Sequence, residues 1–189
     1  MRFWNLKIVN IQALLQLNTP FQLLAVVIYA FRLWPAVRRV SWFDSGPARF
    51  IAIAALFVVV DIGLLVFLIV SLLSGAYGPM QEDITLLKIP VWLIFALDHA
   101  IFIGVMSNAI IALLLELTAG RGPRSRRVED LLFWGTNLGL VGFIAGLALE
   151  QPILKQVFSP IMGVSLLVGL GVLAMRLFAT PDRSAPGAR

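Results

Sequence analysis

The sequence predicts an all-α fold, a polytopic transmembrane helical bundle, and three observations support this prediction. Sixty per cent of the 189 residues are hydrophobic and only 13% are charged, whereas a soluble domain is about half apolar and about a quarter charged. The mean hydropathy is +0.94. Most of the charged residues lie in short stretches between five apolar runs, each long enough to cross a hydrocarbon layer of about 30 Å. We therefore expect five spans in a single domain, residues 1–178.

The five apolar runs define the predicted spans, at residues 21–37, 50–73, 89–117, 131–149 and 157–178. The first run is the shortest and ends in Trp34 and Pro35. Proline should end or kink a helix, because it lacks a backbone donor and its ring clashes with the preceding turn. An alternative with four spans, in which residues 8–34 lie in the membrane interface, therefore stays open. Residues 179–189 combine Pro, Gly, Ser and Arg without apolar periodicity, which is typical of a disordered tail.

The distribution of Lys and Arg predicts the orientation, because short loops rich in these residues stay in the cytoplasm. Eleven of the fifteen fall on one side of the five predicted spans and four on the other. The sequence therefore predicts an N-terminus outside and a C-terminus inside, and the excess of Arg over Lys favours a bacterial cytoplasmic (cell inner) membrane. The eleven are Arg32, Arg38, Arg39, Arg49, Arg121, Arg124, Arg126, Arg127, Arg176, Arg183 and Arg189; the four are Arg2, Lys7, Lys88 and Lys155.

The composition excludes several kinds of chemistry. The chain has no Cys, which excludes disulfides, thiolate nucleophiles and iron–sulfur clusters. Its single His, His99, excludes a metal site built from several His of one chain. The motifs of P-loops, dinucleotide-binding folds, α/β-hydrolases and zinc proteases are all missing from the sequence. We predict no catalytic residues and no metal site, and the basic charge beside the apolar runs indicates topology rather than a nucleic-acid partner.

Three ionisable residues fall inside predicted spans, where a charge is costly and marks a bundle interior, a water-filled cavity or a functional site. Asp61 lies about 18 Å above Arg49 on the second span, and Asp98 and His99 lie roughly 12 to 14 Å below Pro90 on the third. These depths are similar and the two spans are consecutive. We therefore expect Asp61, Asp98 and His99 to form an intramembrane polar cluster, with Asp61 close to His99. Such a cluster serves either proton transfer or cofactor binding, or it only fixes helix pairing.

Small residues recur along the fourth predicted span, where Gly135, Gly139, Gly142 and Gly146 flank Asn137. Small residues at such spacing let two helices approach closely, and an asparagine can donate a hydrogen bond across the contact. We expect these five residues to serve helix packing. The alternative is a cofactor lying against the smooth glycine face.

The third connection is basic, with four arginines between residues 120 and 127. It serves either as a topology anchor or as a contact for anionic lipid headgroups, to which each Arg contributes about 1 kcal/mol. Glu116 falls close to this connection, at the end of the third span, and we expect it to pair with the arginines.

Two stretches resemble adjacent helices in the catalytic subunit of haem-copper oxidases and in small membrane proteins related to it. The first begins Asp98-His99 and continues to Asn108, and the second is Phe133-Trp134-Gly135-Thr136-Asn137-Leu138-Gly139-Leu140. In that family a His early in the first helix ligates a low-spin haem, and His99 matches that position. The resemblance covers residues 98–146. The family uses two His for this haem and further His for copper, so only a haem with one His per chain, or one shared across a homodimer, carries over. The alternative is a degenerate relative of the family that binds no haem.

Three hypotheses about function follow. The first is a structural, accessory or assembly component without chemistry of its own, which acts in the lipid bilayer as a homo-oligomer or within a larger membrane complex. The second is a haem-associated electron-transfer or oxidase-related protein, with His99 as axial ligand and the glycine face of residues 135–146 against the porphyrin. The third is a proton-coupled transporter that uses Asp61, Asp98 and His99.

Overall fold

The computed structural model describes residues 21, 24–25, 27–77, 88–122 and 125–179, and the chain forms two units, residues 1–39 and 40–189. In the first unit, residues 27–39 are helical, and the Arg38 guanidinium lies 5.3 Å from the centre of the Trp34 ring. The helix continues through Pro35, where the sequence predicted an end or a kink. Residues 1–20 and the predicted tail beyond residue 179 lie outside the described part of the chain.

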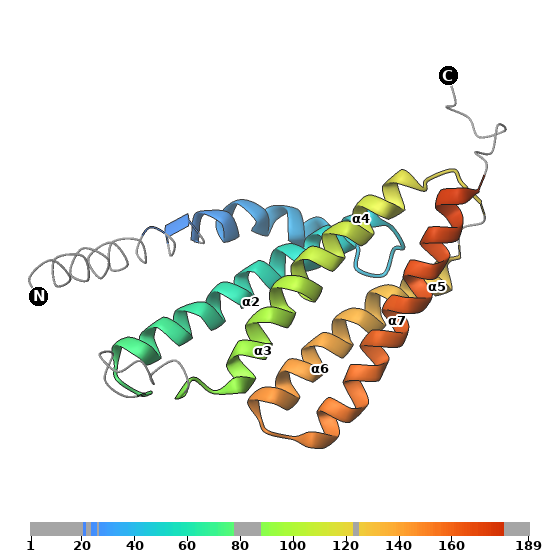
Figure 1. Cartoon of the computed structure of the whole chain (residues 1–189). Helices are drawn as coiled ribbons and strands as arrows, with labels where there is room; N and C mark the ends of the chain where they lie inside the picture. Colours follow the sequence, from blue (N-terminus) through green and yellow to red (C-terminus); the bar gives the residue numbers. More distant parts are fainter. Residues whose placement is uncertain (1–20, 22–23, 26, 78–87, 123–124, 180–189) are drawn as a thin grey trace, which may run out of the picture. The chain divides into compact units, whose positions relative to one another are not determined.

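The described residues of the second unit form four helical rods, and each rod is long and apolar enough to cross a membrane (Figure 1). At 1.5 Å per residue, a rod of 27 residues is about 40 Å long. The described residues thus contain four candidate spans where the sequence predicted five. In chain order the rods are α2 (Pro47–Leu73); α3 (Val91–His99), η2 (Ala100–Ser107) and α4 (Asn108–Leu117); α5 (Arg126–Asp130), η3 (Leu131–Gly135) and α6 (Thr136–Ala148); and α7 (Pro152–Phe178).

Proline and glycine set several of the rod ends. Pro47 and Pro152 occupy the first turns of α2 and α7, where the missing N–H has no intrahelical acceptor and the fixed φ suits a helix. Gly75, with φ of 73°, follows α2 in the left-handed region that glycine adopts without strain. Both proline-initiated helices begin before the apolar runs predicted at residues 50 and 157. The difference arises because the first turns carry polar residues such as Lys155, which the apolar runs left out.

The rods pack in chain order, α2 against the second rod, the second rod against α6, and α6 against α7 (Figure 1). Near one end of the bundle Phe50 and Phe133 meet edge to face, with ring centres 5.1 Å apart. Such a pair adds about 1 kcal/mol to the burial of its rings. They pack with Ile111, Ala112, Leu115, Leu132 and Leu173, and a second buried group consists of Phe57, Leu140 and Met162.

One end of the bundle is rich in arginine. It is the end where α2 begins and where α4 and α7 finish, and we call it the basic end. Arg49, Arg121, Arg126 and Arg176 lie there, at or beside the ends of the rods. Lys155 lies at the opposite end, in the first turn of α7.

Two of the rods contain a π-helical segment, η2 in the second and η3 in the third. A π turn closes its hydrogen bond five residues along instead of four, so it is wider than an α turn, and it occurs often at functional sites. In η2 the wider turn brings Gly104 against α2, where a Cβ on this glycine would lie 2.5 Å from the Phe57 ring. Glycine is therefore the residue that lets α2 and η2 approach this closely.

Candidate functional site

Two buried asparagines join the second and third rods. Asn108 Nδ2 donates to Asn137 Oδ1 at 2.9 Å, and Asn137 Nδ2 donates to Asn108 Oδ1 at 3.1 Å. Both residues are buried. A reciprocal amide pair satisfies a donor and an acceptor on each side, which matters where no water replaces a lost partner.

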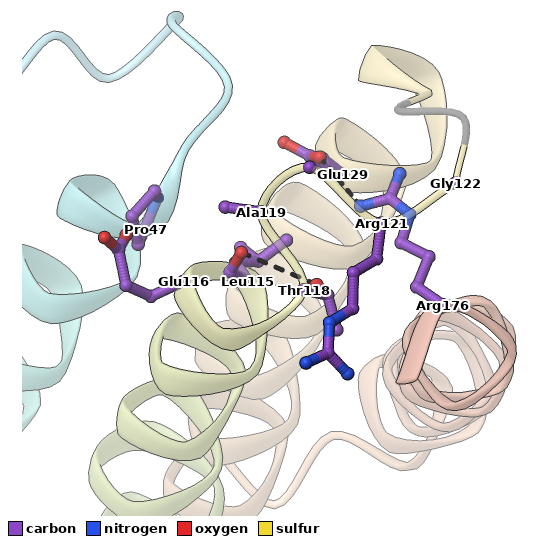
Figure 2. A pocket seen from close by; sticks show the side chains of 10 residues that line it. Pro47, Leu115, Glu116, Thr118, Ala119, Arg121, Gly122, Glu129 and Arg176 are labelled. Atoms are coloured by element: carbon purple, nitrogen blue, oxygen red, sulfur yellow. Dashed lines mark hydrogen bonds and ion pairs between the residues drawn. The ribbon is translucent and has the colours of Figure 1, made fainter. Parts of the chain in front are cut away.

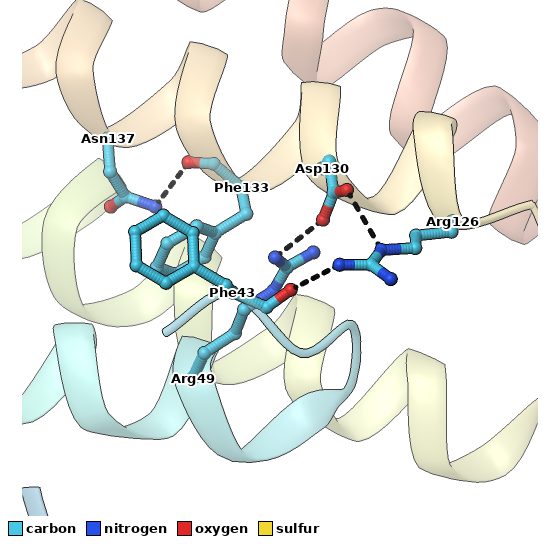
Figure 3. A network of polar contacts seen from close by, with 6 residues as sticks. All are labelled: Phe43, Arg49, Arg126, Asp130, Phe133 and Asn137. Atoms are coloured by element: carbon cyan, nitrogen blue, oxygen red, sulfur yellow. Dashed lines mark hydrogen bonds and ion pairs between the residues drawn. The ribbon is translucent and has the colours of Figure 1, made fainter. Parts of the chain in front are cut away.

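The remaining amide donors bond to the π-helical segments that precede each asparagine. Asn108 Nδ2 also lies 2.9 Å from the Gly104 carbonyl oxygen and 3.2 Å from that of Ile103. Asn137 Nδ2 lies 2.8 Å from the Phe133 carbonyl oxygen (Figure 3). Carbonyl groups in widened turns need partners inside an apolar bundle. The side chains that join the two rods therefore also stabilise the irregular backbone of both.

The glycine face of the third rod lies against α7. A Cβ at Gly139 would lie 2.9 Å from the backbone nitrogen of Met162, and one at Gly135 would overlap the Ser165 hydroxyl. Gly142 faces Phe158, and Gly146 faces Leu154 and Lys155. The absence of side chains at these four positions sets the close approach of α6 and α7. Because α7 covers this face, it is not open to a porphyrin.

His99 is the last residue of α3 and contacts the third rod. Its Nδ1 lies 2.8 Å from the carbonyl oxygen of Phe95, and since a carbonyl only accepts, Nδ1 carries the proton and Nε2 keeps its lone pair in the neutral ring. The imidazole also packs on Phe143, with ring centres 4.8 Å apart. The ring is thus held in a fixed orientation with one nitrogen available.

The other two members of the expected polar cluster do not join His99. Asp61 is partly buried on α2 and Asp98 is exposed on α3. No hydrogen bond or ion pair links either carboxylate to His99 among the described residues, where the partners of His99 are Phe95 and Phe143. The similar depth of Asp61 and His99 did not bring them into contact, because the imidazole turns towards α6.

An ion pair at the basic end ties α2 to the third rod (Figure 3). Arg49 is fully buried and donates to Asp130 Oδ1 at 2.7 Å. Two of its nitrogen atoms have no hydrogen-bond acceptor among the described residues, but its guanidinium lies 4.6 Å from the centre of the Phe133 ring and 5.6 Å from that of Phe50. These aromatic faces stabilise the charge. Arg126 meets the other oxygen of Asp130 at 3.6 Å and donates to the carbonyl of Phe43 at 3.0 Å.

A second buried ion pair joins α7 to α5 beside a small cavity (Figure 2). Arg176 Nη1 lies 3.4 Å from Glu129 Oε1, and the two side chains are 8% and 3% exposed. The cavity has a volume of about 130 Å³ and lies between the end of α4, the loop after it and the end of α7. Its lining residues are Pro47, Leu115, Glu116, Thr118, Ala119, Gly120, Arg121, Gly122, Glu129 and Arg176.

Comparisons of the chain with protein-family models, with curated proteins and with solved structures give no match. What the protein does must therefore follow from the positions of these polar groups.

The sequence patterns missed the polar contacts that hold the rods together. Asn108 was noted only as part of the stretch that resembles the oxidase helix. Arg49 and Arg176 were used only to predict the orientation, and Glu129 and Asp130 were not singled out. Two signals could have found them. Asn108 and Asn137 lie on adjacent spans, each inside an apolar stretch, and the Glu129-Asp130 pair directly follows a basic run at a span end, where buried arginines need carboxylates. Glu116, expected to pair with the arginines, lines the same cavity as Arg121 but has no ion pair among the described residues.

Proposed function

We propose that this chain is a five-span protein of the bacterial cytoplasmic membrane, with its N-terminus outside and C-terminus inside, and that it serves as a structural or accessory component of a membrane complex. The observation that carries the proposal is the reciprocal Asn108–Asn137 pair. Two buried amide side chains in the apolar part of the bundle are thus used to join its own rods. A scaffold requires this arrangement, whereas a transport path would leave such groups open to water.

The orientation is supported by where the charges lie on the bundle. Arginines that are far apart in the sequence meet at the basic end, through the contacts of Arg49, Arg126 and Arg176 with Asp130 and Glu129. A single arginine-rich end is what cytoplasmic loops with excess positive charge produce.

The accessory role is supported by Asp98, an exposed carboxylate about one third of the way along a candidate span. A charge facing lipid at such a depth costs several kcal/mol, so a neighbouring polypeptide is its expected partner. We expect Asp98→Leu to reduce the apparent mass of the detergent-extracted complex on a native gel, without lowering the melting temperature of the purified chain. Phe102→Leu, one turn further along the exposed side of the same rod, is the matched control and should leave the mass unchanged. An unchanged mass for Asp98→Leu would contradict the accessory role.

One observation favours haem binding as a second candidate. The hydrogen bond from His99 Nδ1 to Phe95 fixes the tautomer in which Nε2 can bind a metal. His99 would hold the iron, and a bound haem would supply one-electron transfer. Since the chain has one His, a second His for the iron would have to come from another copy of the chain.

An absorption spectrum of protein purified from haem-replete cells distinguishes the two functions. A stable, colourless protein supports the scaffold and eliminates haem binding. A haem band that is lost in His99→Ala but kept in Met106→Leu, which alters another exposed residue of the same rod, supports the second function and removes the first.

A further inference from the structure

Arg176 differs from the other buried arginine of the basic end. Its Nε and Nη2 atoms have no hydrogen-bond acceptor among the described residues, although the residue is only 7% exposed. Arg49 has the same two atoms unpaired, but aromatic faces lie against it. Arg176 has no such ring in the described part of the chain, and its contact with Glu129 is long for an ion pair, at 3.4 Å. A buried guanidinium with unpaired nitrogen atoms and one long ion pair still requires oxygen acceptors.

The unpaired atoms of Arg176 belong to a residue that lines the cavity shown in Figure 2. The cavity is also lined by Glu116, which lies on the side of Pro47 and is an exposed carboxylate with no ion pair in the described structure. The cavity of about 130 Å³ is therefore lined by a buried cationic group that lacks acceptors and by an exposed carboxylate that forms no ion pair among the described residues. A simple anion would be attracted by Arg176 but repelled by Glu116, whereas a zwitterion satisfies both.

The cavity lies where the rods end. Pro47 begins α2, Leu115 and Glu116 finish α4, and Arg176 is in the last turn of α7. In a bundle whose rods cross a bilayer, this level is occupied by phospholipid headgroups. Gly120 and Gly122 line the cavity, and both have a positive φ, which glycine adopts without strain.

We propose that this cavity binds the headgroup of a phosphatidylethanolamine molecule, with the phosphate at Arg176 and the ammonium group at Glu116. Arg121 also lines the cavity, and its Nη1 donates to the Leu177 carbonyl at 3.3 Å. Glu129 holds the Arg176 side chain in place from the protein side. The inference rests on the membrane placement of the bundle and is independent of whether the chain is a scaffold or binds haem.

Native mass spectrometry of the detergent-purified full chain tests the proposal with three lipids of equal chain length, phosphatidylethanolamine, phosphatidylcholine and phosphatidylglycerol. Phosphatidylcholine has no N–H donor for Glu116, and phosphatidylglycerol has no cation, so each should bind about tenfold more weakly, the value of one charge-assisted hydrogen bond. Equal retention of the three lipids would overturn the proposal. So would binding of soluble phosphoethanolamine as tight as that of the lipid, because the ligand would then be a free metabolite.

Two exposed positions provide variants that leave the buried ion pair intact. Glu116→Gln should abolish the preference for phosphatidylethanolamine over phosphatidylcholine, whereas Glu150→Gln, an exposed carboxylate at the opposite end of the bundle, should keep it. Ala119→Leu should fill the cavity and reduce phosphatidylethanolamine binding at least tenfold. A folded Ala119→Leu protein that retains the lipid as the native chain does would refute the assignment of the site.

Discussion

At the scale of single residues, the bundle depends on a few polar side chains whose partners are buried with them. In Asn108–Asn137 each amide is the other's partner, so truncating one leaves the other unsatisfied in an apolar interior. Hydrogen bonds between membrane helices contribute about 0.6 kcal/mol on average and up to about 1.7 kcal/mol. The pair should reach the upper part of this range, because each amide also supports a π-helical segment.

We therefore expect Asn108→Leu and Asn137→Leu each to reduce the free energy of unfolding by about 1 to 2 kcal/mol. The double variant should lose clearly less than the sum, because no orphaned amide remains. Reversible unfolding in mixed detergent micelles measures all three values. Ser107→Ala is the control, since its hydroxyl bonds only to its own rod, at Phe102, and should change stability by less than about 0.5 kcal/mol. Additive losses would show that the amides act independently.

The two arginines that share Asp130, Arg49 and Arg126, should contribute unequally to the stability of the chain. The Arg49 side chain is fully buried and that of Arg126 is 66% exposed. We expect Asp130→Ala, which strips the buried guanidinium of its carboxylate, to cost about 3 kcal/mol of unfolding free energy. Arg126→Ala, which removes only the exposed partner, should cost less than about 1 kcal/mol. Thermal unfolding in detergent measures both, and equal losses would refute the dominant role of Arg49.

At the scale of the elements, two glycines on the neighbouring helices α6 and α7 differ in whether packing requires them. On α6, a Cβ at Gly139 would collide with the backbone of α7, which cannot rotate away as a side chain can. On α7, Gly163 has nothing within 4 Å of its added Cβ. The same residue type is therefore required by packing at one position and tolerated at the other.

Gly139→Ala should destabilise the chain by about 1 to 3 kcal/mol, the usual cost of overpacking. Gly163→Ala should be neutral or stabilise by up to about 1 kcal/mol, because alanine favours a helix interior. Melting temperatures of the two variants in the same detergent provide the comparison. A stable Gly139→Ala protein would mean that α6 and α7 can separate without loss.

The sequence predicted the rods better than the contacts between them. Apolar runs of sufficient length identify spans because the bilayer imposes their length, and four of the predicted runs correspond to rods. The contacts of the site residues were harder to predict, because the direction of a side chain depends on whether the helix around it is wound as an α-helix or a π-helix. Asp61 and His99 agree in depth, yet the imidazole packs on Phe143, and nothing in the apolar periodicity indicates η2.

At the scale of the whole molecule, the arrangement of charges leads to a topology prediction. The basic end gathers Arg49, Arg121, Arg126 and Arg176, so it should face the cytoplasm. Reporter proteins fused after Arg127 and at the C-terminus should behave as cytoplasmic, and one inserted between Gly78 and Asp83 should behave as external. A reporter inserted at the exposed loop residue Ser41 should also behave as cytoplasmic and serves as a control. A cytoplasmic signal between Gly78 and Asp83 would contradict the orientation.

The wide winding of η2 has a consequence for the register of the second rod. Each π turn takes up one residue more than an α turn, and one residue corresponds to about 100° of rotation. A helical wheel drawn from Val91 through Leu117 therefore assigns the wrong direction to residues on one side of Ala100–Ser107. If the same residues wound as an α-helix throughout, the two halves would turn against each other, and the rod could keep Asn108 facing Asn137 or His99 facing Phe143 but not both. Deleting one residue within the segment would allow the α winding and still keep both contacts.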